Sequence, residues 1–153
     1  LSSTCGVPHR LPFLWNLIRY PMVGELAQLF MNEGMVRQNL REAFADPQKV
    51  TNDVVTAYTE PLLRPGSWAA NLRTERSTDP KFVEQKLNEI HCPVLIVWGQ
   101  QDAWHPVGMV NAFHQQLPQA ELEILANCGH LPHEEQPECF NQRALEFINR
   151  KVK

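Results

Sequence analysis

The hydrophobic and polar positions divide the chain into two halves with different periodicities. From residue 7 to about residue 78, apolar side chains recur every three or four positions, which is the spacing of amphipathic helices. After residue 80, short continuous apolar runs alternate with helical stretches. The pattern therefore predicts an all-helical first half without strands, followed by an α/β second half.

Prolines and turn residues separate the helices of the first half. The apolar stripes predict helical segments over residues 11–19, 23–31, 35–44, 53–63 and 67–76. Thr51 or Asn52 is expected to cap the fourth segment, because short polar side chains accept hydrogen bonds from the first backbone N–H groups of a helix. Pro65 is expected to occupy the first turn of the fifth segment.

The second half has the pattern of a parallel sheet. A continuous apolar run rich in β-branched residues covers 94–98 between Pro93 and Gly99, which is typical of a strand buried on both faces. A second short strand is expected over 121–125, and the β-α-β-α order is the unit of a doubly wound sheet. The helical segments expected here cover 82–90, 107–117 and 137–151, and the inward side chains of the last are Phe140, Ala144, Leu145, Phe147 and Ile148.

Two strands do not form an independently stable sheet. We therefore expect the rest of the sheet to be missing or supplied by another chain, with the strand over 94–98 at an open edge. The chain does not begin with Met, and Leu1–Gly6 has the pattern of a strand end that runs into a loop. These features predict a fragment or a processed product of a longer protein.

Composition narrows the class of protein. Hydrophobic residues make up 43% and charged residues 20%, as in ordinary globular domains. The net charge of -3 gives no reason to expect nucleic acid or an anionic membrane as partner, and no apolar run approaches the ~20 residues of a membrane helix. The four cysteines show no C-x-x-C spacing, so a reduced, cytoplasmic protein is expected.

Two polar residues follow the predicted strands directly. Asp102 lies three residues after Gly99, and His130 follows Gly129 in the loop after the second strand. Open α/β sheets bind ligands outside the carboxyl ends of their strands. A carboxylate there can orient a histidine, and a neutral imidazole is a general base at neutral pH. Together they form two thirds of a triad in the order nucleophile, acid, base.

Each residue also has a structural interpretation. Asp102 alone could be a turn aspartate that caps the following helix, and His130 alone could bond only to backbone. Cys128, His130 and His133 offer three candidate metal ligands, but their spacing matches no usual zinc pattern, and we expect no metal. Surface or structural positions are expected for His9, His91, His105 and His114.

These elements resemble the C-terminal part of the α/β-hydrolase superfamily. The segment 93–99 followed by Asp102 resembles its acid strand and loop. The segment 129–140, with Gly129-His130 at its start, resembles its catalytic histidine loop and last helix. The resemblance implies that His130 is the general base and Asp102 its orienting acid, and it implies no cofactor.

The resemblance extends to the first half of the chain. Residues 1–6 resemble the end of the core strand that precedes the cap, 7–78 resemble the inserted helical cap, and 79–153 resemble the C-terminal part of the core. Such caps occur in epoxide hydrolases, haloalkane dehalogenases and C–C bond hydrolases. The cap residues that would line an apolar substrate pocket are Trp15, Phe30, Met31, Met35, Phe44 and Trp68, although they could equally pack the cap helices together.

The chain departs from the family pattern in one respect. The family carries its nucleophile on a G-x-[Ser/Asp/Cys]-x-G elbow, and no two of the seven glycines here lie four positions apart. Ser2, Ser3, Thr4 and Cys5 are the nearest candidates but lack a preceding strand.

The sequence therefore predicts part of a hydrolase that cleaves an ester, epoxide, C–halogen or C–C bond of a small, largely apolar substrate. This part is expected to be inactive without the missing N-terminal half of the fold. The alternative is a non-catalytic small-ligand-binding or regulatory remnant of the same fold.

Overall fold

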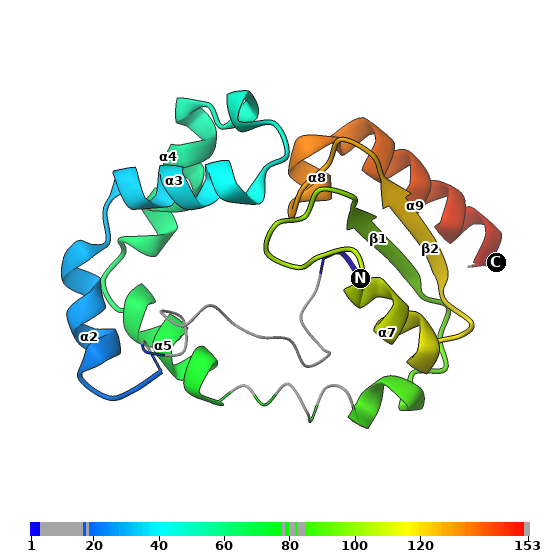
Figure 1. Cartoon of the computed structure of the whole chain (residues 1–153), viewed down its shortest axis with the longest axis horizontal. Helices are drawn as coiled ribbons and strands as arrows, with labels where there is room; N and C mark the ends of the chain where they lie inside the picture. The colour runs from blue at the N-terminus through cyan, green and yellow to red at the C-terminus, as the bar shows by residue number, and fades with distance from the viewer. Residues whose placement is uncertain (4–16, 18, 78, 80–81, 83–84, 152–153) are drawn as a thin grey trace. The chain divides into compact units, whose positions relative to one another are not determined.

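The computed structural model describes residues 1–3, 17, 19–77, 79, 82 and 85–151 (Figure 1). The chain divides into two compact units. Unit 1 comprises Leu1–Pro8, Arg41–Lys49 and Pro80–Lys153, and unit 2 comprises His9–Leu40 and Val50–Asp79. Among the described residues, no helix combines the length and the apolar character that crossing a membrane requires.

The sheet of unit 1 confirms the predicted parallel strand pair. Strand β1 (Leu95–Gly99) pairs with β2 (Glu121–Leu125), in a register that runs from Leu95 opposite Glu121 to Gly99 opposite Leu125. Because the strands are parallel, their carboxyl ends meet at one edge of the sheet. The loops that leave this edge contain Asp102 and His130.

The other side of β1 is not the open edge that we expected. Ser2 forms a parallel bridge with Val97, and the Val97 N–H donates to the Leu1 carbonyl oxygen at 2.8 Å. The Ser3 N–H in turn donates to the Val97 carbonyl oxygen at 3.2 Å. The sequence predicted that Leu1–Gly6 is the end of a strand. It did not predict that this strand pairs with β1. The first residues of the chain thus supply the neighbour of β1.

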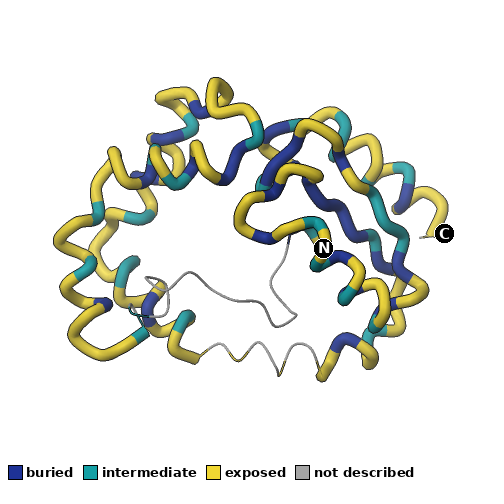
Figure 2. The backbone as a smooth tube through the Cα atoms, viewed as in Figure 1, coloured by how far each residue is buried: buried dark blue, intermediate teal, exposed yellow. Residues whose placement is uncertain are grey.

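Helices cover both faces of this sheet. Ile96 and Trp98 pack in one apolar cluster with Val110 and Phe113 of helix α7 (Met109–Gln116). Val97 packs on the opposite face with side chains that include Phe140 of helix α9 (Pro137–Lys151). Strand β1 is accordingly buried from Ile96 to Gly99 (Figure 2), which agrees with its uninterrupted apolar sequence.

Two helical details of unit 1 differ from the sequence expectation. A short helix, α8 (Pro132–Glu135), was not predicted, and it begins with Pro132 in its first turn. In α9, Phe147 is buried as expected, but Leu145 and Ile148 are 59% and 48% exposed. A sheet of so few strands is too narrow to cover the whole apolar stripe of the helix. A short 3₁₀ helix, η3 (Leu87–Glu89), precedes β1.

The described elements from Val23 to Ser77 are helical, as predicted. They are α2 (Val23–Ala27), η1 (Gln28–Phe30), α3 (Glu33–Ala43), η2 (Pro47–Lys49), α4 (Asn52–Leu62) and α5 (Ser67–Ser77). Thr51 caps α4 by accepting a hydrogen bond from the Val54 N–H at 3.3 Å. Pro65 does not begin α5 as expected. It lies in the preceding turn, which Gly66 completes with a φ of 86°. Most of the segment predicted over 11–19 lies outside the described residues.

Hydrogen bonds join the helices within unit 2. The Trp68 indole N–H of α5 donates to the Gly24 carbonyl oxygen of α2 at 2.7 Å. The Arg76 guanidinium at the end of α5 donates to both carboxylate oxygens of Glu25, at 2.8 and 3.0 Å. These contacts fix α2 against α5.

Candidate active site

The loop after β1 holds the Asp102 carboxylate in place through backbone groups. Asp102 is 5% exposed, and its Oδ1 accepts hydrogen bonds from the N–H groups of Trp104 and His105 at 2.9 and 2.8 Å. This is the turn role that the sequence suggested as the structural interpretation. It uses only one of the two carboxylate oxygens, so the other is left to face the neighbouring loop.

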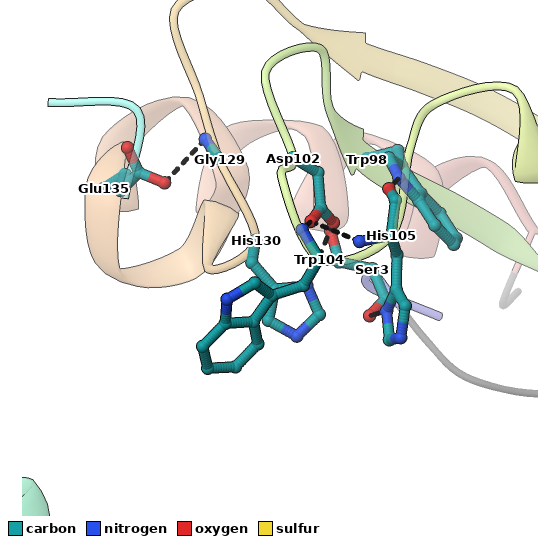
Figure 3. Close-up of polar contacts among 8 residues, drawn as sticks. All are labelled: Ser3, Trp98, Asp102, Trp104, His105, Gly129, His130 and Glu135. Atoms are coloured by element: carbon teal, nitrogen blue, oxygen red, sulfur yellow. Dashed lines mark hydrogen bonds and ion pairs between the residues drawn. The ribbon is translucent and has the colours of Figure 1, made fainter. Parts of the chain in front are cut away.

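The second oxygen, Oδ2, faces His130 from the loop after β2. Nδ1 of His130 lies 2.9 Å from Oδ2 (Figure 3), with side-chain exposures of 14% for the histidine and 0% for the aspartate. An ionised carboxylate only accepts hydrogen bonds, so Nδ1 carries the hydrogen and donates it. In the neutral imidazole, Nε2 then keeps its lone pair. The predicted contact is therefore present, in the tautomer that a general base requires.

The environment of Asp102 favours its ionised form. Burial alone raises the pKa of a carboxyl group, but the hydrogen bonds from His130 and from the His105 backbone outweigh burial, so the pKa of Asp102 is lowered overall. This stabilisation is present above the ordinary aspartate pKa of about 3.9 and is lost as the pH falls through the lowered value. At neutral pH the Asp102 side chain is therefore a carboxylate.

Two glycines allow the acid loop and the histidine loop to touch. A Cβ on Gly99 would lie 1.9 Å from the Gly129 carbonyl oxygen, and a Cβ on Gly129 would lie 2.2 Å from the Ala43 carbonyl oxygen. Both obstacles are backbone atoms that cannot move aside, so both positions require glycine. The Gln101 N–H also donates to the Cys128 carbonyl oxygen at 2.9 Å.

A buried carboxylate fixes the backbone of the histidine loop. Glu135 in α8 is 3% exposed, and its two oxygens accept hydrogen bonds from the N–H groups of Gly129 at 2.6 Å and Ala45 at 2.8 Å. The His130 N–H donates to the Ala43 carbonyl oxygen at 2.7 Å. Segment 43–45 and Glu135 therefore hold the backbone on both sides of Gly129. Glu135 lies within the segment 129–140 that resembles the histidine loop and last helix, but the sequence predicted no role for it.

Two aromatic rings from the acid loop enclose the His130 imidazole. The Trp104 ring centroid lies 4.9 Å from that of His130, and the His105 centroid lies 4.8 Å away in an edge-on arrangement (Figure 3). Trp104 is 41% exposed, whereas His105 is buried. Neither residue was predicted at the site. Their positions two and three residues after the acid were the available signal.

The histidines form a different potential metal-ligand group from the one considered in the sequence. Ligand atoms of Asp102, His105 and His130 lie within 4.8 Å of one another. Asp102 already accepts three hydrogen bonds, so its oxygens are committed to the loop and to His130. This hydrogen bonding fits an acid–base pair better than a metal centre. His133 is exposed and contacts Phe140 instead.

Cys128 lies next to the site but is not a reactive thiol. Burial, followed by the negative charge of Glu135, raises the pKa of Cys128 to about 12. Of the predicted substrate-binding residues, four described ones belong to unit 2, namely Phe30, Met31, Met35 and Trp68. Phe30 and Met35 are 71% and 40% exposed. Met31 and Trp68 are partly buried, Phe44 is buried in unit 1, and Trp15 lies outside the described residues.

The sequence is similar to those of known hydrolases. A relative 28% identical over 108 residues is a 2-hydroxy-6-oxononadienedioate/2-hydroxy-6-oxononatrienedioate hydrolase of Burkholderia vietnamiensis (strain G4 / LMG 22486), covering 69% of this chain and 38% of the relative. Carboxylesterase YbfK of Bacillus subtilis (strain 168) is 38% identical over 78 residues, covering 49% of this chain and 26% of the relative.

The fold of the chain also matches that of a solved hydrolase structure. A mutant of the meta-cleavage product hydrolase from Pseudomonas fluorescens IP01 superimposes with a TM-score of 0.75 over 98% of this chain and 54% of its own. Its identity of 18% shows the fold alone. The chain spans less than half the length of curated relatives that it matches.

The family itself is identified by a sequence profile. The profile of the alpha/beta hydrolase family matches residues 2–141. That range includes the strand pair, the acid loop and the histidine loop. Because the match runs through every element that builds the site, the chain belongs to the alpha/beta hydrolase family.

Proposed function

We propose that this chain supplies the acid and the base of a nucleophile-His-Asp triad, with His130 as general base and Asp102 as its orienting acid. The observation that carries the proposal is the 2.9 Å contact between Nδ1 and Oδ2 at the carboxyl ends of two adjacent parallel strands. The lowered pKa of Asp102 and the Nδ1–H tautomer both support it. Nε2 would take the proton of the nucleophile and later return it to the leaving group.

The charge that develops on His130 during such a reaction has two sources of stabilisation. The Asp102 carboxylate compensates the imidazolium directly. The indole of Trp104, with its centroid 4.9 Å from that of His130, lies within the ~6 Å over which an aromatic face attracts a cation. Both groups are in place before the proton moves, so little reorganisation is needed.

The nucleophile would come from an N-terminal half of the fold, on an elbow that this chain does not contain. We therefore expect the 153-residue chain alone to show no turnover. The similarity to a 2-hydroxy-6-oxononadienedioate hydrolase and to a carboxylesterase favours C–C bond or ester hydrolysis over cleavage of the other bonds. A serine on the elbow would support those two reactions, whereas an aspartate would support dehalogenation or epoxide opening.

Apolar residues of unit 2 are proposed to bind the apolar part of the substrate. Phe30, at 71%, is the most exposed of the described residues that were predicted to bind substrate, so its side chain is available to a ligand. Phe30→Ser should raise KM and leave kcat little changed. Leu29 is 79% exposed and serves as the matched control. If Leu29→Ser raises KM as much as Phe30→Ser, the assignment is wrong.

The triad is tested in a reconstituted protein, meaning this chain joined to a nucleophile-bearing N-terminal half. The substrates are short-chain aryl esters, an epoxide, a haloalkane and a vinylogous 1,5-diketone for C–C cleavage. His130→Ala should lower kcat by about 10⁴-fold or more. His133→Ala, which changes an exposed histidine three residues away, should leave kcat nearly unchanged.

Two results would contradict this proposal. A dead His133 variant beside an active His130 variant would mean that the base is assigned wrongly. A reconstituted protein that binds a small apolar ligand but turns over none of the substrates would favour the non-catalytic alternative.

A further inference from the structure

His105 is a buried histidine that the proposed triad does not use. It lies three residues after Asp102 and is 8% exposed. Its contacts reach the acid loop, the core of the sheet and the first residues of the chain. A buried imidazole with contacts in so many directions determines where its neighbours lie.

The backbone of His105 links the Asp102 carboxylate to the core of the sheet through two hydrogen bonds. Its N–H donates to Asp102 Oδ1 at 2.8 Å, and its carbonyl oxygen accepts from the Trp98 indole N–H at 2.9 Å. Trp98 is fully buried in β1, so this second contact is anchored in the core. A shift of His105 would therefore move the Asp102 carboxylate.

The ring of His105 joins the acid loop to the segment that pairs with β1. Nδ1 lies 3.1 Å from the Ser3 carbonyl oxygen, and because a carbonyl only accepts, Nδ1 carries a hydrogen and donates it. Ser3 has a φ of 34°, which is uncommon for a residue with a side chain and persists where the surroundings hold it. The Ser3 N–H bonds to Val97 and its carbonyl bonds to His105, so both sides of this residue are held.

The same ring packs against the proposed base. Its centroid lies 4.8 Å from that of His130 at an interplanar angle of 69°. Figure 3 shows the His105 ring beside that of His130, with Trp104 also in contact. The ring that bonds to Ser3 thus limits the rotation of the imidazole that bonds to Asp102.

We propose that His105 is a positioning residue for the Asp102–His130 pair, and that the hydrogen bond from its Nδ1 to the Ser3 carbonyl oxygen is the contact through which it acts. This inference deepens the proposed function and rests on it. His105 fixes the carboxylate through its backbone and the His130 ring through its side chain, and it transfers no proton itself.

The test uses nuclear magnetic resonance on the 153-residue chain with ¹⁵N-labelled histidine. A ring N–H that donates to a buried carboxylate gives a strongly downfield proton signal, and the Asp102→Asn variant assigns this signal to His130. His105→Phe keeps a ring of similar size without the donor. His105→Asn places an amide N–H near the position of Nδ1 and so keeps a donor for Ser3. His114→Phe, at an exposed histidine of α7, is the control.

The inference predicts an order of protection for the His130 Nδ1 proton. Its exchange with water should be about tenfold faster in His105→Phe, intermediate in His105→Asn and unchanged in His114→Phe. In the reconstituted protein, the same order should appear as a fall in kcat with KM nearly constant. Equal protection in the phenylalanine variant and the unsubstituted chain, or no advantage of asparagine over phenylalanine, would overturn the inference.

A measurement on the unsubstituted chain tests the inference even where a variant does not fold. The ¹⁵N shifts of His105 in the unsubstituted chain report its tautomer, and a hydrogen on Nδ1 is expected. A hydrogen on Nε2 alone would overturn the inference, because the bond to Ser3 could not form. Failure of the proposed function looks different: the downfield His130 proton would be absent, or would survive Asp102→Asn.

Discussion

Two buried carboxylates of unit 1 are held differently from the ion pairs of unit 2. In unit 1, Asp102 and Glu135 are buried, and backbone N–H groups donate hydrogen bonds to each carboxylate. In unit 2, the described ion pairs are exposed, as in Arg76 with Glu25 and Arg37 with Glu33. A buried charge with several fixed donors has one orientation, whereas an exposed pair retains freedom.

The apolar side chains show the reverse distribution. The sheet of unit 1 buries Ile96 and Trp98 completely, whereas unit 2 leaves Met22, Leu29 and Phe30 more than two thirds exposed, at 75%, 79% and 71%. Unit 1 therefore holds the Asp102–His130 pair in a fixed position, and unit 2 offers apolar surface. The buried residues of unit 1 and the exposed residues of unit 2 should therefore respond differently to substitution.

The largest expected effect is at the contact between the two loops of unit 1. Gly99→Ala would place a Cβ 1.9 Å from the Gly129 carbonyl oxygen. We expect the free energy of unfolding to fall by about 3 kcal/mol or more, because only backbone could move. Urea unfolding followed by tryptophan fluorescence measures the change.

Gly108→Ala is the matched control for this prediction. A Cβ on Gly108 meets no atom within 4 Å, and the backbone there has a φ of -58° that alanine adopts freely. Alanine should raise the free energy of unfolding by about 0.5 kcal/mol by restricting the unfolded chain. Equal costs at positions 99 and 108 would contradict the close packing of the loops.

A buried carboxylate should matter more than an exposed one of the same helix. Glu135→Gln must turn an amide N–H toward a backbone donor, either that of Gly129 or that of Ala45. We expect the free energy of unfolding to fall by about 2 kcal/mol. Glu134→Gln, at an exposed position, should change it by less than about 0.5 kcal/mol. Similar losses for the two variants would show that Glu135 does not hold the histidine loop.

Exposed charges of unit 2 should have smaller effects. Arg76→Lys removes the fork that grips both oxygens of Glu25, but the side chains are 30% and 55% exposed. The expected loss of stability is small, and it should shrink in high salt. The hydrogen bond from Arg76 is the largest cause that lowers the pKa of Glu25 to about 2, so titration of Glu25 should move upward in the variant. An unchanged titration would mean that the pair does not form.

The smallest effect is chemical and leaves stability unchanged. Burial raises the pKa of Cys128 to about 12, so only about one thiol in 10⁴ would be ionised at pH 8. Iodoacetamide at that pH should label exposed Cys92 and leave Cys128 unmodified in the folded chain, as read from peptide masses. Equal labelling would show that the core beneath the histidine loop is open.

The sequence predicted the acid–base contact because the elements that create it are local. Short apolar runs end at Gly99 and before Gly129, and parallel strands bring such ends to one edge of a sheet. Asp102 and His130 follow those ends within a few residues. The distance between Asp102 and His130 then depends on the pairing of the two strands, which the apolar pattern already predicts.

The contacts that the sequence missed depend on tertiary packing. Glu135 acts through Ala45, 90 positions earlier, and His105 acts through Ser3, 102 positions earlier. No periodicity in a sequence reports which backbone group a buried side chain will meet. Leu145 was placed inward by its helical spacing, yet helical spacing does not say how wide the covering sheet is.

The central claim is that Asp102 orients His130 for proton transfer, and turnover of Asp102→Asn in the reconstituted protein tests it most directly. The amide oxygen can still accept from Trp104 and His105, so the loop should keep its shape. The amide N–H would face Nδ1 and favour the wrong tautomer of His130. The account predicts that kcat falls about 10⁴-fold with an unchanged melting profile. A kcat within about tenfold of the unsubstituted protein would contradict it.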